Sequence, residues 1–308
     1  MTAALWLVLA FGARTEARLP EPPPGLDLYM PVPEENPLTP QKVALGRRLF
    51  FDKRLSRDRT LACASCHDPA RAFSDGRAVA RGIGGAEGRR NSPAIINRGY
   101  GASHFWDGRA PALERQVIEP ITNPKELGLS LAELERRTGL KAVEVARALA
   151  SYVRTIRSGG SRVDRFFAGE RNALSDVERA GLALFRGKAN CTACHVGPNF
   201  TDERFHNTGV AWRDGRIADD GRFAVTGKNE DRGAFKTPTL REVARTAPYM
   251  HDGSFGSLGE VVDFYSEGGR RNPHLDPEIR PLRLSAPEKA AMVAFLKLLS
   301  GRVRDGWR

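Results

Sequence analysis

The chain contains four cysteines, arranged in two pairs that share the same spacing and the same neighbour. They form two Cys-x-x-Cys-His segments, Cys63-Ala64-Ser65-Cys66-His67 and Cys191-Thr192-Ala193-Cys194-His195. This is the attachment pattern of c-type haem, in which two thiols bond to the vinyl groups of one porphyrin and the adjacent histidine binds the iron. The two segments therefore predict two covalently bound haem c groups.

Three other chemistries use paired cysteines, and each leaves part of the pattern unexplained. A zinc site needs four nitrogen or sulfur ligands, whereas each segment supplies only three. A redox-active dithiol needs no adjacent histidine and would rarely occur twice. Two local disulfides would close small strained loops and would give no role to His67 or His195.

Composition narrows the class of protein. The chain has 308 residues, of which 41% are hydrophobic and 28% charged, which is typical of a globular protein and excludes wholesale disorder. A mean hydropathy of -0.41 argues against a polytopic membrane protein. The net charge of +11 favours an acidic partner or surface. Nucleic acid is not predicted as a partner, because no basic block is interleaved with aromatic residues.

The N-terminus is consistent with export. Residues 3–12 form an apolar run that is shorter than the roughly 20 residues needed to span a bilayer. A signal peptide over residues 1–17 is favoured, with cleavage near Ala13 or Ala17, and an uncleaved anchor remains the alternative because the first residues carry little charge. Residues 18–36 are predicted to form an extended, Pro-rich leader without a packed core. Since haem c is attached outside the cytoplasm, the expected location is the periplasm.

An internal repeat precedes the two haem segments. Each copy begins with a helix N-cap and continues with a small residue followed by large apolar ones. The copies read Leu38-Thr39-Pro40, Gly46 and Leu49-Phe50, and then Leu174-Ser175-Asp176, Gly181 and Leu184-Phe185. The repeat predicts a mainly α fold with two cytochrome c-like domains, over residues 37–160 and 161–308, each binding one haem.

Further helices are predicted over residues 141–157 and 287–299 from their apolar periodicity. Ser175 with Glu178, and Ser285 with Glu288, have the spacing of a capping box. Long loops over residues 68–111 and 197–248 are rich in Gly, Pro and Arg and are expected to wrap the haems. Sustained two-residue alternation is absent, so extensive sheet is not expected.

Several further motifs extend along nearly the whole chain. They are Cys63 to Phe73, Arg90-Asn91-Ser92-Pro93, Phe105-Trp106-Asp107-Gly108-Arg109, Asn123-Pro124-Lys125-Glu126, Phe205-His206-Asn207-Thr208-Gly209, Lys236-Thr237-Pro238-Thr239-Leu240-Arg241 and Ala247-Pro248-Tyr249-Met250-His251-Asp252-Gly253. With these motifs the chain resembles the bacterial di-haem cytochrome c peroxidase family, and within it the MauG-like (methylamine utilisation) branch, over about residues 37–301.

The resemblance implies a role for individual residues around the N-terminal haem, which is the peroxide site in this family. His67 corresponds to the proximal iron ligand, Glu126 to the distal acid/base carboxylate and Gln116 to its polar neighbour. Such a carboxylate moves a proton between the two peroxide oxygens during O–O cleavage. Trp106 corresponds to the tryptophan between the haems. The alternatives are a helix-start carboxylate for Glu126 and a core aromatic for Trp106.

Two features depart from the ordinary peroxidases of the family. The loop after the first haem, residues 81–85, has no histidine to cap the iron, and the next histidine is His104. The departure predicts an iron that is open in the oxidised protein and needs no reductive activation. Opposite His195, the position of the usual methionine holds Tyr265, as in MauG-like members. Met250 is the main rival as the sixth ligand, and His206 and His251 are less favoured.

The family also holds a calcium ion between its domains. By resemblance, its protein ligands are the side-chain amide of Asn91 and the backbone carbonyls of Thr246 and Pro248. Such hard oxygen ligands suit calcium.

Together these features predict a periplasmic MauG-like di-haem peroxidase that uses hydrogen peroxide to oxidise a protein substrate. One alternative is ordinary cytochrome c peroxidase activity, with a small cytochrome c or cupredoxin as electron donor. Another is a non-catalytic di-haem electron carrier. No membrane span is expected in the mature form if the signal is cleaved.

Overall fold

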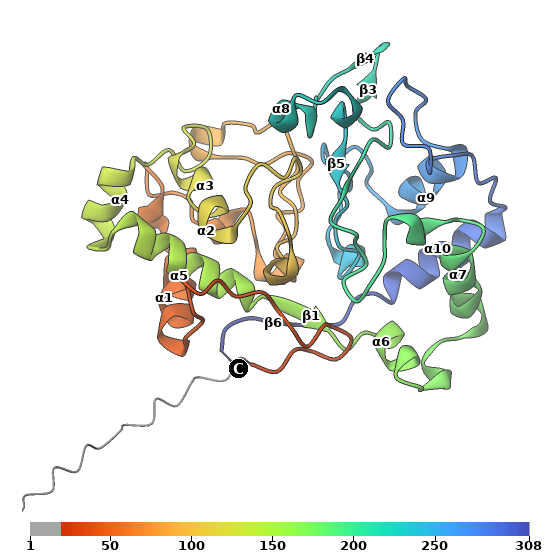
Figure 1. Cartoon of the computed structure of the whole chain (residues 1–308), viewed down its shortest axis with the longest axis horizontal. Coiled ribbons are helices and arrows are strands. Elements are labelled where there is room, and N and C mark those ends of the chain that lie inside the picture. Colours follow the sequence, from red (N-terminus) through yellow and green to blue (C-terminus); the bar gives the residue numbers. More distant parts are fainter. Residues whose placement is uncertain (1–19, 308) are drawn as a thin grey trace, which may run out of the picture.

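The computed structural model describes residues 20–307, and in this part of the chain two helix-rich halves meet at a central junction (Figure 1). The predicted signal peptide lies outside the described residues. No helix in the range 20–307 is long and apolar enough to cross a membrane.

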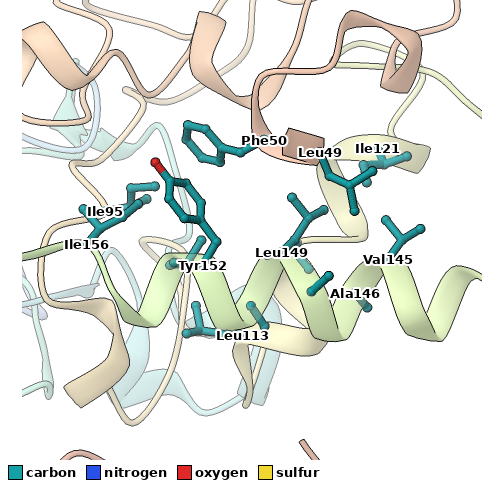
Figure 2. Close-up of a cluster of buried hydrophobic side chains, with 14 of the residues drawn as sticks. Leu49, Phe50, Ile95, Leu113, Ile121, Val145, Ala146, Leu149, Tyr152 and Ile156 are labelled. Carbon is teal, nitrogen blue, oxygen red and sulfur yellow. The ribbon is translucent and has the colours of Figure 1, made fainter. Parts of the chain in front are cut away.

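The first half is built on the pair α1 (Pro40–Phe50) and α5 (Ala142–Arg154). Thr39 caps α1 by accepting a hydrogen bond from the Lys42 N–H at 3.2 Å. The two helices approach so closely at Gly46 that a Cβ there would lie 1.9 Å from the Ala148 carbonyl oxygen. Beyond this contact the Phe50 ring packs edge-on against Tyr152, with centroids 5.1 Å apart (Figure 2).

The second half repeats this arrangement with α7 (Asp176–Arg186) and α10 (Ala286–Lys297). A Cβ at Gly181 would lie 2.1 Å from the Ala291 carbonyl oxygen, and the rings of Phe185 and Phe295 are 5.0 Å apart. The sequence repeat therefore corresponds to the same type of helix pair in each half. Both predicted capping boxes, at the starts of α7 and α10, are confirmed.

The other helices are short, and the strands form only two-stranded antiparallel ribbons. The helices are α2 (Leu113–Gln116), α3 (Glu119–Thr122), α4 (Leu131–Thr138), α6 (Arg162–Phe167), α8 (Phe223–Thr226) and α9 (Leu258–Glu267). The ribbons pair β1 (Arg157–Gly159) with β6 (Arg302–Arg304), β2 (Phe205–His206) with β5 (Phe235–Lys236), and β3 (Trp212–Arg213) with β4 (Arg216–Ile217). The helix-rich fold and the lack of extensive sheet are as predicted, but α9 was not predicted, although Ser257 and Glu260 form a capping box at its start.

Two separate hydrophobic clusters form the cores, one drawn mainly from residues 30–156 and one from residues 163–299. Both ends of the described chain cross between the two halves. Asp305, near the C-terminus, accepts a hydrogen bond from the Tyr152 hydroxyl at 2.7 Å. In the leader, Met30 is buried in the first cluster, and the Gly25 carbonyl accepts a hydrogen bond from Arg241 at 2.7 Å. Residues 20–36 thus contain no helix or strand, but they pack on both halves, which the expectation of an extended leader did not include.

The close helix contact leads to a stability prediction. Gly181→Ala is expected to lower the free energy of unfolding by about 1–3 kcal/mol, because the added methyl group overlaps the Ala291 carbonyl. This loss exceeds the gain in helix propensity of about 1 kcal/mol. Denaturant unfolding of the haem-loaded protein measures the effect. Gly259→Ala in α9 is the matched control, since the nearest atom to its Cβ is 3.6 Å away, and equal stability of the two variants would contradict the prediction.

Candidate functional site

The two haem-segment histidines are held in the same way. His67 Nδ1 lies 3.2 Å from the Phe73 carbonyl oxygen, and His195 Nδ1 lies 2.9 Å from the Phe200 carbonyl oxygen. Both phenylalanines have left-handed backbones, with φ of 59° and 50°, which turn these carbonyls towards the rings. A hydrogen bond at Nδ1 fixes the ring and leaves Nε2 for a metal. Burial lowers the pKa of both histidines, which favours the neutral form that binds iron.

The four cysteines are free thiols, so the disulfide alternative does not hold in the structure. Burial raises the pKa of Cys63 and of Cys191 to about 12. The thiolate that a zinc site or a redox-active dithiol requires is therefore disfavoured at both positions. Among the described residues, the one group of three ligands close enough for a metal is Cys194, Asp202 and His206.

Both segments line one cavity of about 740 Å³. Its walls next to the first segment include Leu61, Ile95, Leu113, Val117, Leu149 and Val153. Next to the second segment they include Phe185, Leu258, Val262, Leu284, Met292 and Leu296. Apolar walls, two thiols and one fixed histidine on each side are the requirements of a covalently attached porphyrin, so the residues present fit two haem c groups.

Glu126 and Gln116 line the cavity together with the first segment. Gln116 ends α2, and Glu126 lies in the turn after α3, where its N–H donates to the Asn123 carbonyl at 3.0 Å. Glu126 is thus not at the start of a helix. Asn123 Nδ2 donates to Glu126 Oε1 at 2.7 Å. Burial raises the pKa of Glu126, while the Asn123 hydrogen bond and the charge of Arg109 oppose that rise.

The loop over residues 81–85 is attached to the Glu126 segment. The Ile83 N–H donates to the Glu126 carbonyl at 2.9 Å, and Ile83 is buried. Gly82 packs so tightly that a Cβ would lie 1.8 Å from the Lys125 carbonyl oxygen. The Ile83 side chain packs against Gly128, where an added Cβ would lie 2.7 Å from Ile83 Cδ1. His104 also lines the cavity, where it is buried near the charges of Arg98 and Lys236, and burial lowers its pKa to about 3.

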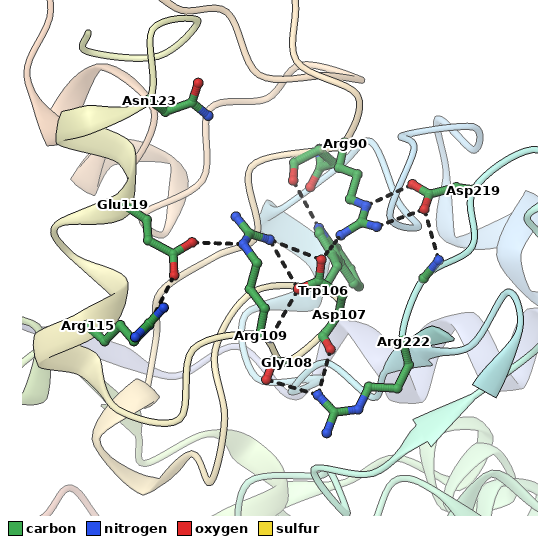
Figure 3. A network of polar contacts seen from close by, with 12 residues as sticks. Arg90, Trp106, Asp107, Gly108, Arg109, Arg115, Glu119, Asn123, Asp219 and Arg222 are labelled. Carbon is green, nitrogen blue, oxygen red and sulfur yellow. Dashed lines mark hydrogen bonds and ion pairs between the residues drawn. The ribbon is translucent and has the colours of Figure 1, made fainter. Parts of the chain in front are cut away.

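Trp106 lies at the junction of the two halves. Its indole Nε1 donates to the Asn91 carbonyl at 2.9 Å, and its own carbonyl accepts the Lys236 N–H at 2.8 Å. A polar network surrounds it (Figure 3). Arg90 from the first half bridges Asp107 at 2.6 Å and Asp219 of the second half at 2.8 Å.

A second contact across the junction holds the same loop. Arg222 Nη1 donates to the carbonyls of Asp107 and Gly108, both at 3.0 Å. The junction thus holds the Trp106 segment by contacts from both halves.

Comparison with known proteins decides the family. The model of the di-haem cytochrome c peroxidase family matches residues 40–172. The methylamine utilization protein MauG of Methylorubrum extorquens is 41% identical over 290 residues, covering 88% of this chain and 81% of that protein. This chain belongs to the di-haem cytochrome c peroxidase family.

Two more similarities extend over almost the whole peroxidase. The cytochrome-c peroxidase IdrP1 of Pseudomonas sp. is 36% identical, covering 96% of this chain and 90% of that protein. The crystal structure of a MauG-like protein associated with microbial copper homeostasis superposes with a TM-score of 0.80 at 34% identity, covering 95% of this chain and 96% of that one. The protein is therefore an oxidoreductase of the di-haem peroxidase type, and its family implies two haem c groups, hydrogen peroxide and a redox partner.

The peroxidase places the candidate sixth ligands of its second haem around the same cavity. Tyr265, on α9, and Met250 both line it with His195. Burial raises the pKa of Tyr265, so its phenolate needs a compensating cation such as iron. His206 is already engaged, because Nδ1 lies 2.6 Å from Asp276 and Nε2 lies 2.9 Å from Asp202.

His251 lines the same cavity. Its ring stacks on Phe235 at 3.6 Å between centroids, with an interplanar angle of 12°. All four candidate side chains thus line the cavity, and the identity of the sixth ligand stays a prediction.

The three predicted calcium ligands, Asn91, Thr246 and Pro248, line the same cavity. Asn91 Nδ2 donates to the Arg77 carbonyl at 2.6 Å, which leaves Oδ1 to face a cation. The Asn91 backbone connects the site to the junction, since its N–H donates to His251 at 2.7 Å and its carbonyl accepts the Trp106 indole. These residues fit a calcium site linked to the tryptophan.

Removing calcium is therefore expected to change the environment of Trp106. We expect chelation to alter the spectrum of at least one haem, and added calcium to restore it, because Asn91 holds the indole. Absorption and EPR spectra before and after chelation measure the change. Asn91→Ala should reproduce the chelated spectrum without chelator. Loss of calcium with both haem spectra unchanged would contradict a link between this site and the haems.

Sequence reasoning missed the groups that position the predicted residues. Asn123 holds Glu126, and the signal that could have found it is an asparagine three residues before the carboxylate. The carbonyls of Phe73 and Phe200 hold the two histidines, and no side-chain pattern identifies them, because they act through the backbone.

Proposed function

We propose that this peroxidase acts in the periplasm as a MauG-like enzyme, using hydrogen peroxide to oxidise a protein substrate. Peroxide would bind at the His67 haem, with Tyr265 as sixth ligand of the second haem. Covalent haem attachment supports the location, and the net charge of +11 favours a substrate protein with an acidic surface.

The observation that carries the proposal is the loop beside Glu126. Arg81 and Gly82 of this loop line the cavity together with Glu126, and the Ile83 hydrogen bond to the Glu126 carbonyl and the tight packing of Gly82 hold the loop in place. The loop over residues 81–85 contains no histidine that could cap an iron. These observations support a first haem whose peroxide side would stay open in the oxidised protein, with the Glu126 carboxylate in the same cavity.

The chain's own residues provide proton transfer and orientation. When bound, the haem at His67 supplies the iron that binds peroxide and the electrons that cleave its O–O bond. Glu126 takes a proton from one peroxide oxygen and returns it to the other, and Asn123 keeps the carboxylate oriented. Gln116, on the same wall, can donate or accept a hydrogen bond to peroxide.

Trp106 supports transfer of oxidising equivalents between the two haems. Its ring is held between the halves by Asn91, and its backbone is bonded to the strand β5 of the second half. An oxidisable ring in this position shortens the steps between the two centres. The equivalents would then leave the second haem for a protein bound at the surface.

Low-temperature EPR of the fully oxidised, calcium-loaded protein tests the proposal. We expect one high-spin ferric signal, from the open His67 haem, beside one low-spin signal. Two low-spin signals without a high-spin component would overturn it. The protein would then be an ordinary cytochrome c peroxidase that must be half-reduced, or an electron carrier, and turnover of peroxide by the half-reduced form separates these two.

A further inference from the structure

A buried cation in the cavity wall has no strong partner within the described protein. Lys236, on β5, is only 8% exposed and lines the cavity shared by both haem segments. Its Nζ lies 3.4 Å from the Thr237 carbonyl oxygen and 3.6 Å from Glu203 Oε2. Both separations exceed the 2.7–3.2 Å of a good N–H···O hydrogen bond, and an ammonium group has three hydrogens to donate.

The nearest carboxylates are committed to other groups. Arg98 forms a bidentate ion pair with Glu203, with N–O distances of 2.7 and 2.9 Å. Asp202, whose charge also acts on Lys236, lies 2.9 Å from His206. One carboxylate, Glu203, thus faces two cations, and burial together with the Arg98 charge lowers the pKa of Lys236 to about 7. Burying an ammonium in this way is costly unless an anionic oxygen reaches it.

We infer that Lys236 forms a carboxylate-binding site that holds a haem propionate at the junction between the two halves. A propionate oxygen would accept a short hydrogen bond from the Lys236 ammonium. Its negative charge would also compensate the second of the two cations that face Glu203. Lys236 also donates its backbone N–H to the Trp106 carbonyl at 2.8 Å. The propionate would therefore be anchored on the strand that is bonded to the inter-haem tryptophan, and Figure 1 shows β5 between the two halves.

The inference depends on the two covalent haems and not on the open iron or on the protein substrate. Its test therefore gives a result even if the EPR of the oxidised protein overturns the proposed function. A propionate of either haem has the required chemistry. The haem whose properties respond to Lys236 identifies which of the two it is.

The test is a redox titration of both haems in the haem-loaded protein, comparing wild type with Lys236→Gln. Removing one positive charge near a haem favours its ferric state. We expect the reduction equilibrium constant of one haem to fall about tenfold, which is ~59 mV for one electron. The exposed Lys228 supplies the matched control, and Lys228→Gln should leave both potentials unchanged.

Resonance Raman spectra separate direct contact from a long-range charge effect. In Lys236→Gln the propionate bending band of the affected haem should shift, whereas in Lys228→Gln it should not. A change in potential with an unchanged propionate band would overturn the contact. Unchanged potentials of both haems would overturn the site.

A second variant can still test the proposal if Lys236→Gln does not fold. Lys236→Met removes the charge and leaves an apolar chain of similar length, and Glu203 keeps Arg98 as its partner. Folding is therefore expected to be preserved. Lys236→Met should give the same shifts, and a role confined to structure would lower the unfolding midpoint without moving either potential.

Discussion

Replacing Glu126 with glutamine is expected to lower kcat/KM for hydrogen peroxide by about 10²- to 10⁴-fold. Glutamine has nearly the same shape and still reaches the pocket, but it cannot take a proton from one peroxide oxygen and pass it to the other. Steady-state turnover with an artificial electron donor measures the loss. The absorption and EPR spectra of both haems should be unchanged, because Glu126 is not a proposed iron ligand.

A matched control separates the local effect from a general one. Glu170 is an exposed carboxylate paired with Arg165, and Glu170→Gln should leave the turnover rate unchanged. A rate for Glu126→Gln within about threefold of wild type would be too small a loss for general acid–base catalysis and would exclude Glu126 as the acid/base group.

The pH dependence gives a further readout for the same residue. Burial raises the pKa of Glu126, and its ionised form is the base, so turnover should be lost as the pH falls through this raised pKa. The Asn123 hydrogen bond favours the ionised form. Asn123→Ala should therefore raise the pKa further and move the acid limb to higher pH. Thr122, the exposed residue next to Asn123, provides the control, since Thr122→Ala should leave the acid limb of the pH profile unchanged.

Tyr265→Phe is expected to change the low-spin EPR and absorption spectra of the second haem while leaving the high-spin signal in place. The phenylalanine ring keeps the packing of α9 but has no oxygen to bind iron. Loss of an anionic oxygen ligand also removes negative charge from the iron, so the reduction potential of this haem should rise. A redox titration followed at the low-spin signal measures the shift.

Another tyrosine of the same cavity wall gives the matched control. Tyr249 donates its hydroxyl to the Val243 carbonyl at 3.0 Å, and Tyr249→Phe should leave the low-spin spectrum unchanged. Met250→Leu tests the rival ligand in the same way. If Met250→Leu changes the spectrum and Tyr265→Phe does not, the sixth ligand is the methionine and the MauG-like assignment of this haem fails.

Features that depend on neighbouring residues were predictable from the sequence. Haem attachment requires two thiols and a histidine within five residues, so Cys63 to His67 and Cys191 to His195 identify it without any fold. Helix starts are equally local, because the N-cap side chain bonds a backbone N–H three residues away. The caps at Thr39 and Ser175 are where the sequence places them.

Contacts between distant residues were decided only by the tertiary structure. Arg90 and Asp219 are 129 residues apart, and nothing in their local sequence pairs them across the junction that holds Trp106. Lys236 belongs to a motif in the sequence, but its burial follows from the meeting of β5 with the first half. The leader likewise packs on both halves although its composition is that of an extended chain.

The physical reason is the range over which each interaction acts. Covalent spacing, capping and helix periodicity are satisfied within a few residues, so a single sequence determines them. The burial of a charge, the choice of its partner and the enclosure of a cavity depend on which surfaces meet when the two halves pack. The sequence by itself therefore determined the haem attachment and the helix framework of this peroxidase, and the packing of its halves decided what surrounds each reactive group.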